Sequence, residues 1–374
     1  MSRLPSRLLV PPLALLRDLG QRLSGRRRAA LPENPASILI VHSMLLGDSL
    51  MLYSLLRKVR DRYPTARIVL TVPRPLMPLF ASRPCGIEPL EFDPKRFPTV
   101  RAVLAAGPFD LALVPAENRL AWLARAAGAR HVVGFAGDTP AWKNWMLDTA
   151  VPMPEALTAV GDLFLRLLPG DDPAPFQPGD WPAPAVDEVP VMPPGAIVFH
   201  INSTQATRRW PAERWLELGR RLRARGYQPY WSLGPGEEKL LDEHDPAREF
   251  PTLMLRFAPM WHALAQARLL VGIDTSMTHL ARLAGTPSVV VHGPTHPSLF
   301  GGGIFWQNPR CLPAVIENVP CRDVGRLFRR PVSWARMCSR GLDSCANPYC
   351  IRQISVDQVE HVVNQLLKDS ENHV

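Results

Sequence analysis

Short apolar runs that alternate with amphipathic segments constrain the fold of this chain most. Ser37–Val41 has the sequence SILIV, and after a turn come apolar residues at the 3.6-residue spacing of a helix ending near Tyr63. A second apolar run follows at Ala66–Val72. Runs that are apolar throughout are typical of parallel strands covered on both faces. The order therefore predicts a right-handed βαβ unit.

The same alternation continues through most of the chain. Further strands are predicted at Leu111–Pro115, His131–Phe135, Ile197–Ile201, Tyr227–Leu233, Leu269–Ile273 and Ser288–His292, and helices at Pro211–Arg225, Trp261–Ala267 and Met277–Leu283. A capping box at Ser355–Gln358 begins a last amphipathic helix that reaches about Leu367. The predicted fold class is α/β, with two α/β domains.

An unusual proline content separates the two series. The chain has 374 residues and 41 prolines, well above the roughly 5% usual in proteins, and eight lie between Pro173 and Pro194. Proline lacks the N–H that helices and central strands need, so this stretch is predicted to be a semi-rigid linker. The predicted division is an extension over 1–36, a first domain over 37–185, a second over 186–354 and a terminal helix over 355–374.

The net charge of +9 predicts an anionic partner: nucleic acid, a membrane surface or a phosphorylated ligand. Seven arginines and one acid lie within residues 1–30, around the apolar stretch Leu8–Leu16 that Pro11 and Pro12 interrupt. This segment is either a basic amphipathic element on an anionic leaflet or a frayed extension. Nucleic acid is disfavoured, because the arginines lack interleaved aromatic residues or a binding motif.

The sequence favours a cytoplasmic location. No run approaches the roughly 18 apolar residues of a membrane-spanning helix, and no small-residue cleavage site follows Leu8–Leu16. Six cysteines in a chain of this size do not form a secreted disulfide framework. Within the cysteine-rich stretch 311–350, the candidates for structural zinc or iron ligands are Cys321, Cys338, Cys345 and Cys350. Their spacing lacks the C-x2-C of firm zinc sites, and buried thiols are the alternative.

The turn after the first predicted strand holds a candidate catalytic group. Ser43 begins the turn, and Gly47 and Asp48 end it at the start of a helix. Asp48 is either a general base toward an incoming hydroxyl or a helix cap without further function. The turn has one glycine and no Walker lysine, which disfavours a dinucleotide or P-loop site.

Three clusters in the second domain are candidates for nucleotide binding. Ser203, Thr204 and Arg208 precede a helix that begins with Pro211, which suits a diphosphate or else a solvated basic turn. Glu237 and Glu238 follow another strand, where a carboxylate pairs with ribose or simply starts a helix. The densest cluster offers hydroxyls and N–H groups to a phosphate or sugar, and consists of Asp274, Thr275, Ser276, Thr278, His279, Gly293 and Thr295. His279 is equally a packed core histidine, and no G-x-S-x-G elbow supports a Ser-His-Asp triad.

In this order the clusters resemble glycosyltransferase family 9, the ADP-heptose:lipopolysaccharide heptosyltransferases. The matching stretches are ILIVHSMLLGDSLMLYSLLRKVRDRYPTARIVLTV, TRRWPAERW, GPGEE and LLVGIDTSMTHLARLAGTPSVVVHGPTHPSLFGG. The resemblance implies the GT-B fold, with a cleft between two Rossmann-like domains and a terminal helix that crosses back onto the first.

The resemblance also implies residue roles. Asp48 matches the family's proposed base, Ser203 and Thr204 its donor-phosphate contacts, and Glu238 (or Glu237) its ribose carboxylate. Asp274, Thr275, Ser276 and His279 lie where the family holds the sugar and the diphosphate. The departures are Arg208 for a frequent lysine, Ser276 for a common glycine and His296 for the aspartate of G-P-T-D-P.

The implied activity is inverting transfer of a heptose from ADP-heptose to a lipopolysaccharide inner-core acceptor at the cytoplasmic face of the inner membrane. Arg208, hydroxyls and backbone N–H groups would meet the leaving-group charge rather than a metal, since no DxD motif is positioned for one. The alternatives are a heptosyltransferase that acts on protein side chains, and a non-catalytic nucleotide-sugar-binding or membrane-associated module.

Overall fold

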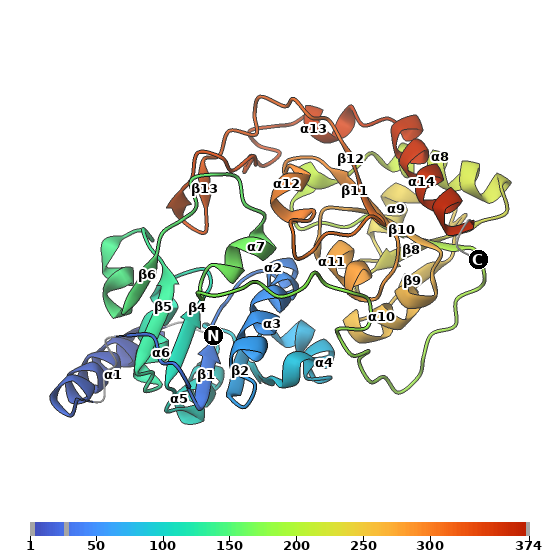
Figure 1. Cartoon of the computed structure of the whole chain (residues 1–374). Helices are drawn as coiled ribbons and strands as arrows, with labels where there is room; N and C mark the ends of the chain where they lie inside the picture. The colour runs from blue at the N-terminus through green and yellow to red at the C-terminus, as the bar shows by residue number, and fades with distance from the viewer. Residues whose placement is uncertain (1–3, 26–29, 372–374) are drawn as a thin grey trace. The chain divides into compact units, whose positions relative to one another are not determined.

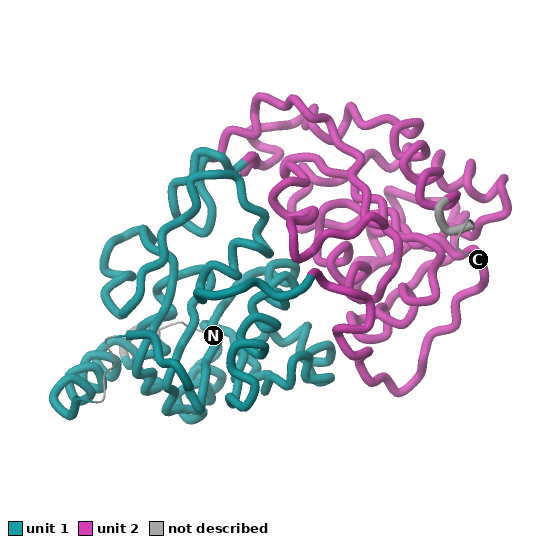
Figure 2. Tube along the Cα trace, in the orientation of Figure 1, with its two compact units in different colours: residues 1–174, 325–335 teal, residues 175–324, 336–374 magenta. Residues whose placement is uncertain are grey.

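The structure, a computed structural model, describes residues 4–25 and 30–371. The chain divides into two compact units, and each contains a six-stranded sheet. Unit 1 comprises Met1–Ala174 and Gly325–Ala335, and unit 2 comprises Pro175–Val324 and Arg336–Val374 (Figure 2). The division confirms two α/β units, but unit 2 begins before the predicted boundary at residue 186, and unit 1 includes the segment predicted as an extension.

Unit 1 is built on a parallel sheet with the strand order β3-β2-β1-β4-β5-β6 (Figure 1). Its strands are β1 Ser37–Ile40, β2 Arg67–Val72, β3 Glu88–Glu91, β4 Leu111–Val114, β5 His131–Phe135 and β6 Thr149–Val151. Its helices are α1 Leu4–Leu23, α2 Leu46–Met51, α3 Tyr53–Arg62, α4 Met77–Phe80, α5 Phe97–Ala106, α6 Arg119–Ala126 and α7 Val160–Leu165, with 3-10 turns η1 Arg74–Leu76, η2 Pro84–Gly86 and η3 Ala141–Met146. This is the doubly wound order of a Rossmann fold.

Unit 2 repeats that topology, with the order β12-β11-β10-β7-β8-β9 and parallel pairing throughout. Its strands are β7 Ala196–His200, β8 Gln228–Leu233, β9 Thr252–Met254, β10 Leu269–Ile273, β11 Ser288–His292 and β12 Cys311–Val315. Its helices are η4 Ala206–Arg208, α8 Ala212–Ala224, α9 Leu240–His244, α10 Phe257–Gln266, α11 Ser276–Leu283, α12 Pro297–Phe300, α13 Tyr349–Arg352 and α14 Val356–Glu371. Because all strands are parallel, the loops that follow them emerge at one edge of each sheet.

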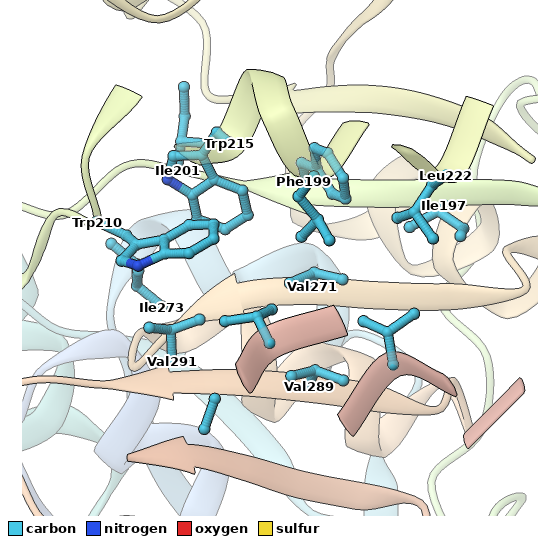
Figure 3. Close-up of a cluster of buried hydrophobic side chains, with 14 of the residues drawn as sticks. Ile197, Phe199, Ile201, Trp210, Trp215, Leu222, Val271, Ile273, Val289 and Val291 are labelled. Atoms are coloured by element: carbon cyan, nitrogen blue, oxygen red, sulfur yellow. The ribbon is translucent and has the colours of Figure 1, made fainter. Parts of the chain in front are cut away.

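The core of unit 2 explains where the terminal helix packs. Phe199 of β7 lies against Trp215 of α8 and Trp231 of β8, with ring centroids 5.4 and 5.7 Å apart (Figure 3 shows Phe199 and Trp215). Val359 and Val363 of α14 are fully buried in this cluster. The expectation that the terminal helix packs on the first domain is therefore wrong, because its apolar face completes the core of unit 2.

The segment that returns to unit 1 is Gly325–Ala335, which carries the short antiparallel pair β13 Arg326–Leu327 and β14 Arg330–Pro331. Arg330 is 1% exposed and donates to the Ala116 carbonyl (2.7 Å), the Asn118 Oδ1 (2.9 Å) and the carbonyls of Phe135 and Ala136. Burial lowers the pKa of Arg330 to about 10. One guanidinium thus ties the returning segment to the ends of β4 and β5.

The proline-rich stretch contains no helix or strand between α7 and β7, as predicted for these described residues. It is not a bare linker, however, because it packs along unit 2. Trp181 is 1% exposed and lies 6.4 Å from the Trp261 ring, and the Phe176 N–H donates to the Phe305 carbonyl at 2.8 Å. His262 also hydrogen bonds to the Pro184 carbonyl at 2.7 Å.

The N-terminal segment forms α1, which continues through Pro11 and Pro12. Ala14 is fully buried in the core of unit 1, and Asp18 pairs with the buried Arg125 of α6 at 3.5 Å. The frayed interpretation is therefore wrong for the described part of this segment. Among the described helices, none is both long and apolar enough to cross a membrane.

Candidate functional site

Two of the predicted clusters meet at the carboxyl edge of the unit 2 sheet. β7 and β10 are neighbours, but the chain proceeds from β7 to β8 on one side and from β10 to β11 on the other. The loops after β7 and β10 therefore diverge, which makes this the switch point where ligands bind in doubly wound sheets. Ser203 and Arg208 follow β7, whereas Asp274 and Thr275 follow β10.

Arg208 joins these loops. Its Nη1 donates to the Asp274 carbonyl at 3.0 Å and lies 3.4 Å from the Asp274 carboxylate. Its Nη2 donates to the Thr295 Oγ1 at 3.4 Å, and its Nε donates to the Gln205 side chain at 3.0 Å. The side chain is nevertheless 26% exposed, so a fixed guanidinium remains accessible to an anion.

The N-terminus of α11 lies beside this guanidinium. The Thr275 Oγ1 accepts from the Met277 N–H at 3.4 Å, which caps the helix, and the Thr278 hydroxyl donates to the Thr275 carbonyl at 2.8 Å. Ser276 is the first residue of the helix and is half-buried. The N–H groups of a first turn and the positive end of the helix dipole favour a phosphate at this position.

Three buried histidines surround the same edge: His200 at the end of β7, His279 in α11 and His292 at the end of β11. Burial lowers the pKa of His200 and of His292 to about 4, and that of His279 to about 3, while the nearby Asp274 opposes the shift for the last two. All three are therefore neutral at neutral pH. The Nδ1 atoms of His279 and His292 have no hydrogen-bond partner among the described residues.

The remaining predicted donor residues differ in how accessible they are. The Glu237 carboxylate folds back to accept the Gly234 N–H at 2.7 Å, whereas Glu238 is exposed and accepts from the Gly236 N–H at 3.2 Å. Ser203 is buried and accepts from the Gln205 N–H, and Thr204 is exposed.

Gly293 and His296 lie after β11. A Cβ atom on Gly293 would come within 3.0 Å of Ile351, and the Gly293 carbonyl accepts from both Nε and Nη2 of Arg322. His296, which stands where the family resemblance leads one to expect aspartate, caps α12 and hydrogen bonds to Glu317 at 2.9 Å. A side chain at position 293 would press against Ile351, so the loop backbone packs closely against α13.

In unit 1, Asp48 lies in the first turn of α2, directly after the loop that follows β1. It is half-buried, as is Gly47, and Ser43 is exposed. The carboxylate is thus at the carboxyl edge of the unit 1 sheet, at the position predicted for it. The preceding His42 was missed: burial lowers its pKa to about 3, and its Nε2 has no hydrogen-bond partner in the part of the chain that the structure describes.

A common signal for His42, His200 and His292 exists in the sequence. Each of them stands at the end of an apolar run that forms a strand. The carboxyl ends of parallel strands are where such sheets hold their ligands, so a histidine in this register is a candidate even without a motif around it.

The cysteines of the stretch 311–350 include the four predicted metal ligands. Within residues 4–25 and 30–371, no group of three or more histidine, cysteine or acidic side chains is arranged to hold a metal ion. Burial raises the pKa of the Cys350 thiol to about 11 and also raises that of Cys321. Neighbouring thiols of this group also raise both pKa values, and a structural metal at Cys321, Cys338, Cys345 and Cys350 stays a prediction.

Comparison with known proteins agrees with this geometry. The family model for glycosyltransferase family 9 (heptosyltransferase) matches residues 100–325. Lipopolysaccharide heptosyltransferase 1 of Pseudomonas aeruginosa is 31% identical over 255 residues, which cover 61% of this chain and 70% of that protein.

Two solved structures share the fold. The glycosyl transferase family 9 from Veillonella parvula superimposes with a TM-score of 0.69 at 16% identity, over 91% of this chain and 99% of that one. The E. coli heptosyltransferase WaaC with ADP-2-deoxy-2-fluoro heptose has a TM-score of 0.63 at 17% identity, over 88% and 99%.

Two doubly wound units are the architecture of the GT-B fold. The match to the family model extends over more than half of the chain. The chain belongs to glycosyltransferase family 9, the heptosyltransferases.

Proposed function

We propose that this enzyme transfers a heptose from ADP-heptose to a lipopolysaccharide inner-core acceptor, with inversion at the anomeric carbon. The relative from P. aeruginosa is a lipopolysaccharide heptosyltransferase, and the fold neighbour WaaC was solved with an ADP-heptose analogue. The observation that carries the proposal is the position of Arg208, which joins Asp274 and Thr295 beside the N-terminus of α11 and remains partly exposed.

The donor would bind at the carboxyl edge of unit 2. Arg208 and the first N–H groups of α11 would hold the diphosphate, because both present positive charge to it. The exposed Glu238 suits the ribose hydroxyls better than the half-buried Glu237. The Nδ1 atoms of the neutral His279 and His292 are buried near this edge without a hydrogen-bond partner among the described residues.

The reaction we propose is a direct displacement. Asp48 removes the proton from an acceptor hydroxyl, whose oxygen forms a bond to the anomeric carbon as the bond between that carbon and the ADP oxygen breaks. The electron pair leaves with ADP. Arg208 and the α11 N–H groups stabilise the negative charge that develops on the departing phosphate.

The acceptor is a lipid-anchored saccharide, so the enzyme would work as a peripheral protein at the cytoplasmic face of the inner membrane. An amphipathic N-terminal helix on unit 1 is consistent with that location.

Transfer from ADP-heptose to a heptose-free truncated core saccharide, followed by mass spectrometry, tests the proposal. The wild-type enzyme should add one heptose. Asp48→Asn should lower kcat by about 10²-fold or more, because general-base catalysis contributes about 10²–10⁴, while the affinity for ADP is unchanged.

The matched control is Asp61→Asn on α3, where the carboxylate forms an exposed pair with Arg57 at 3.0 Å. Wild-type turnover by a folded Asp48→Asn enzyme would remove Asp48 from the mechanism. No transfer by the wild type to the core saccharide, together with transfer to a peptide acceptor, would move the activity to proteins.

A further inference from the structure

We propose that the outer face of α1, together with two tryptophans of η3, is the surface by which unit 1 docks on an anionic lipid bilayer. The inference rests on the proposed function in one respect only, since a lipid-borne acceptor requires the enzyme to reach a membrane. The surface itself is argued from the packing, exposure and charge of unit 1.

The first step is that α1 is fixed to the domain. The Arg125 side chain of α6 is fully buried, lies 3.5 Å from the Asp18 carboxylate and donates to the Gln21 side chain at 3.3 Å. Gln21 in turn donates to the Gly128 carbonyl at 3.1 Å, and Ala14 is fully buried between the two helices. The orientation of α1 is therefore set by polar contacts, and its outer face is held in place.

The second step is that this outer face is apolar. Five leucines of α1 are more than half exposed: Leu9 (51%), Leu15 (52%), Leu16 (68%), Leu19 (55%) and Leu23 (81%). At 3.6 residues per turn they lie within an arc of about 120°, on the side opposite Ala14 and Asp18. We call them the leucine face. The side of α1 that carries Ala14 already packs on the core, so packing within unit 1 does not explain the leucines on the opposite side.

The third step is that two exposed tryptophans stand on the neighbouring element. Trp145 is 67% exposed and Trp142 is 40% exposed. Both rings pack on Trp122 of α6, with centroid distances of 6.4 and 6.1 Å. Arg125, which holds α1, also donates to the carbonyl of Met146 at the end of η3 at 3.2 Å. The same buried side chain thus connects the leucine face and the tryptophans, and tryptophan favours the headgroup level of a bilayer.

The fourth step is the positive charge beside the leucine face, which favours an anionic bilayer as the binding partner. Arg17 and Arg22 are exposed on either side of the leucine face, and the Arg22 Nε also pairs with Asp18 at 2.8 Å. The sequence continues with Arg26, Arg27 and Arg28, which lie outside the described residues. The one acid of α1 up to Leu23, Asp18, is buried against Arg125. An apolar strip with basic borders fits anionic headgroups, whereas a second copy would bring like charges together.

Binding of the full-length enzyme to vesicles tests the proposal. Vesicles of phosphatidylethanolamine and phosphatidylglycerol should retain the wild type, and phosphatidylcholine vesicles should retain much less. Leu16→Glu/Leu19→Glu should weaken binding to anionic vesicles at least tenfold, since burial of a single leucine is worth roughly tenfold. The matched control is Val191→Glu/Ile304→Glu, which alters equally exposed apolar residues of unit 2 (88% and 75%) and should bind like the wild type.

Both variants change solvent-exposed side chains, so their thermal unfolding should match that of the wild type and exclude misfolding. Unchanged vesicle binding by Leu16→Glu/Leu19→Glu would overturn the proposal. So would a wild-type dimer in solution that this variant dissociates, with no vesicle binding, because the face would then pair two copies.

A comparison of acceptors separates this inference from the proposed function. The Leu16→Glu/Leu19→Glu enzyme should transfer heptose normally to a soluble truncated core saccharide and poorly to the same saccharide on a lipid in vesicles. Vesicle binding without any transfer by the wild type would leave the docking surface standing and refute the proposed activity. Transfer to the vesicle-bound acceptor at the wild-type rate would refute the docking surface alone.

Discussion

Replacement of Arg208 by lysine tests the donor site most directly, because the change keeps the charge and removes the geometry. In the structure three nitrogens of the guanidinium serve three different partners: Gln205, the Asp274 carbonyl and the Thr295 hydroxyl. A lysine ammonium is a single nitrogen on a flexible stem. It can stay near the diphosphate but cannot join the loops after β7, β10 and β11 at once.

The magnitude follows from those contacts. Lysine retains one hydrogen bond and loses two, each worth about 0.5–1.5 kcal/mol, which gives about 1–3 kcal/mol in total. Arg208 is 26% exposed, so water replaces part of the loss, and we expect the lower part of that range, about 1–2 kcal/mol or 5- to 30-fold in kcat/KM. Arg208→Gln also removes the charge-assisted bond to phosphate, which costs about another 1.5–3 kcal/mol.

The assay is calorimetric binding of ADP together with kcat/KM for ADP-heptose. The control is Arg221→Lys in α8, where the side chain pairs with Glu217, Asp357 and Glu360 away from the switch point, and should leave ADP affinity unchanged. If Arg208→Lys equals the wild type and Arg208→Gln falls, charge alone matters and the three-way geometry is irrelevant. If both variants equal the wild type, Arg208 does not face the diphosphate.

Two further predictions concern stability. Arg330→Met should remove the donor of the Ala116 and Ala136 carbonyls and lower the free energy of unfolding by about 2–4 kcal/mol, seen in calorimetry as a lower Tm for unit 1. Arg326→Met, at an exposed position of the same segment, should have little effect, and equal Tm values for both would contradict the role of Arg330. Burial lowers the pKa of His279 to about 3 and of His292 to about 4. Each histidine therefore adds stability to the folded protein that is present above pH 6.5. This stability is lost as the pH falls toward the folded-state pKa, because only the unfolded chain takes up the proton. Between pH 7 and 5.5 this amounts to about 1 kcal/mol for each histidine; urea unfolding of His292→Asn should show a smaller loss over this range, and a loss equal to that of the wild type would contradict the assignment.

The central strands could be predicted from sequence, and the edge strands could not. β5, β10 and β11 occupy the predicted residues, because a strand covered on both faces must be apolar throughout. β3 has the sequence EPLE with every residue half-buried, and β6 has the sequence TAV. Such segments become strands because a formed neighbour offers them hydrogen bonds, and their own residues carry no matching pattern.

For the terminal helix α14, the sequence predicts the local structure but not the domain on which the helix packs. Its capping box is formed as predicted: the Gln358 N–H donates to Ser355 Oγ at 3.1 Å, and the Ser355 N–H donates to the Gln358 side chain at 2.9 Å. An amphipathic pattern fixes that one face is buried but not which core receives it. The segment that does return to unit 1 is held by Arg330 through hydrogen bonds to carbonyls, and this kind of attachment leaves no apolar periodicity in the sequence.

Part of the proposed donor site could be predicted from the sequence, because parallel strands bring the ends of distant segments to one edge. Arg208 and Thr295 are 87 positions apart in sequence, yet they form a hydrogen bond at the predicted anion site. His292 was given no role from the sequence, since a histidine at the end of a valine-rich strand has the same local pattern whether it packs or binds. Its burial, and the lack of a partner for its Nδ1 among the described residues, are properties of the fold.

The net charge of +9 also has a more specific meaning in the structure. Arg282, Arg322 and Arg330 are nearly fully buried and donate to backbone carbonyls such as those of Gly301 and Gly293. These three charges, a third of the net excess, stabilise loops and are not displayed to any partner. The accessible basic groups that bear on function are then Arg208 at the switch point of unit 2 and the arginines beside the leucine face of unit 1. A net charge predicts an anionic partner only where accessible cations carry it, and the partners that we propose for those of this chain are a diphosphate and a lipid surface.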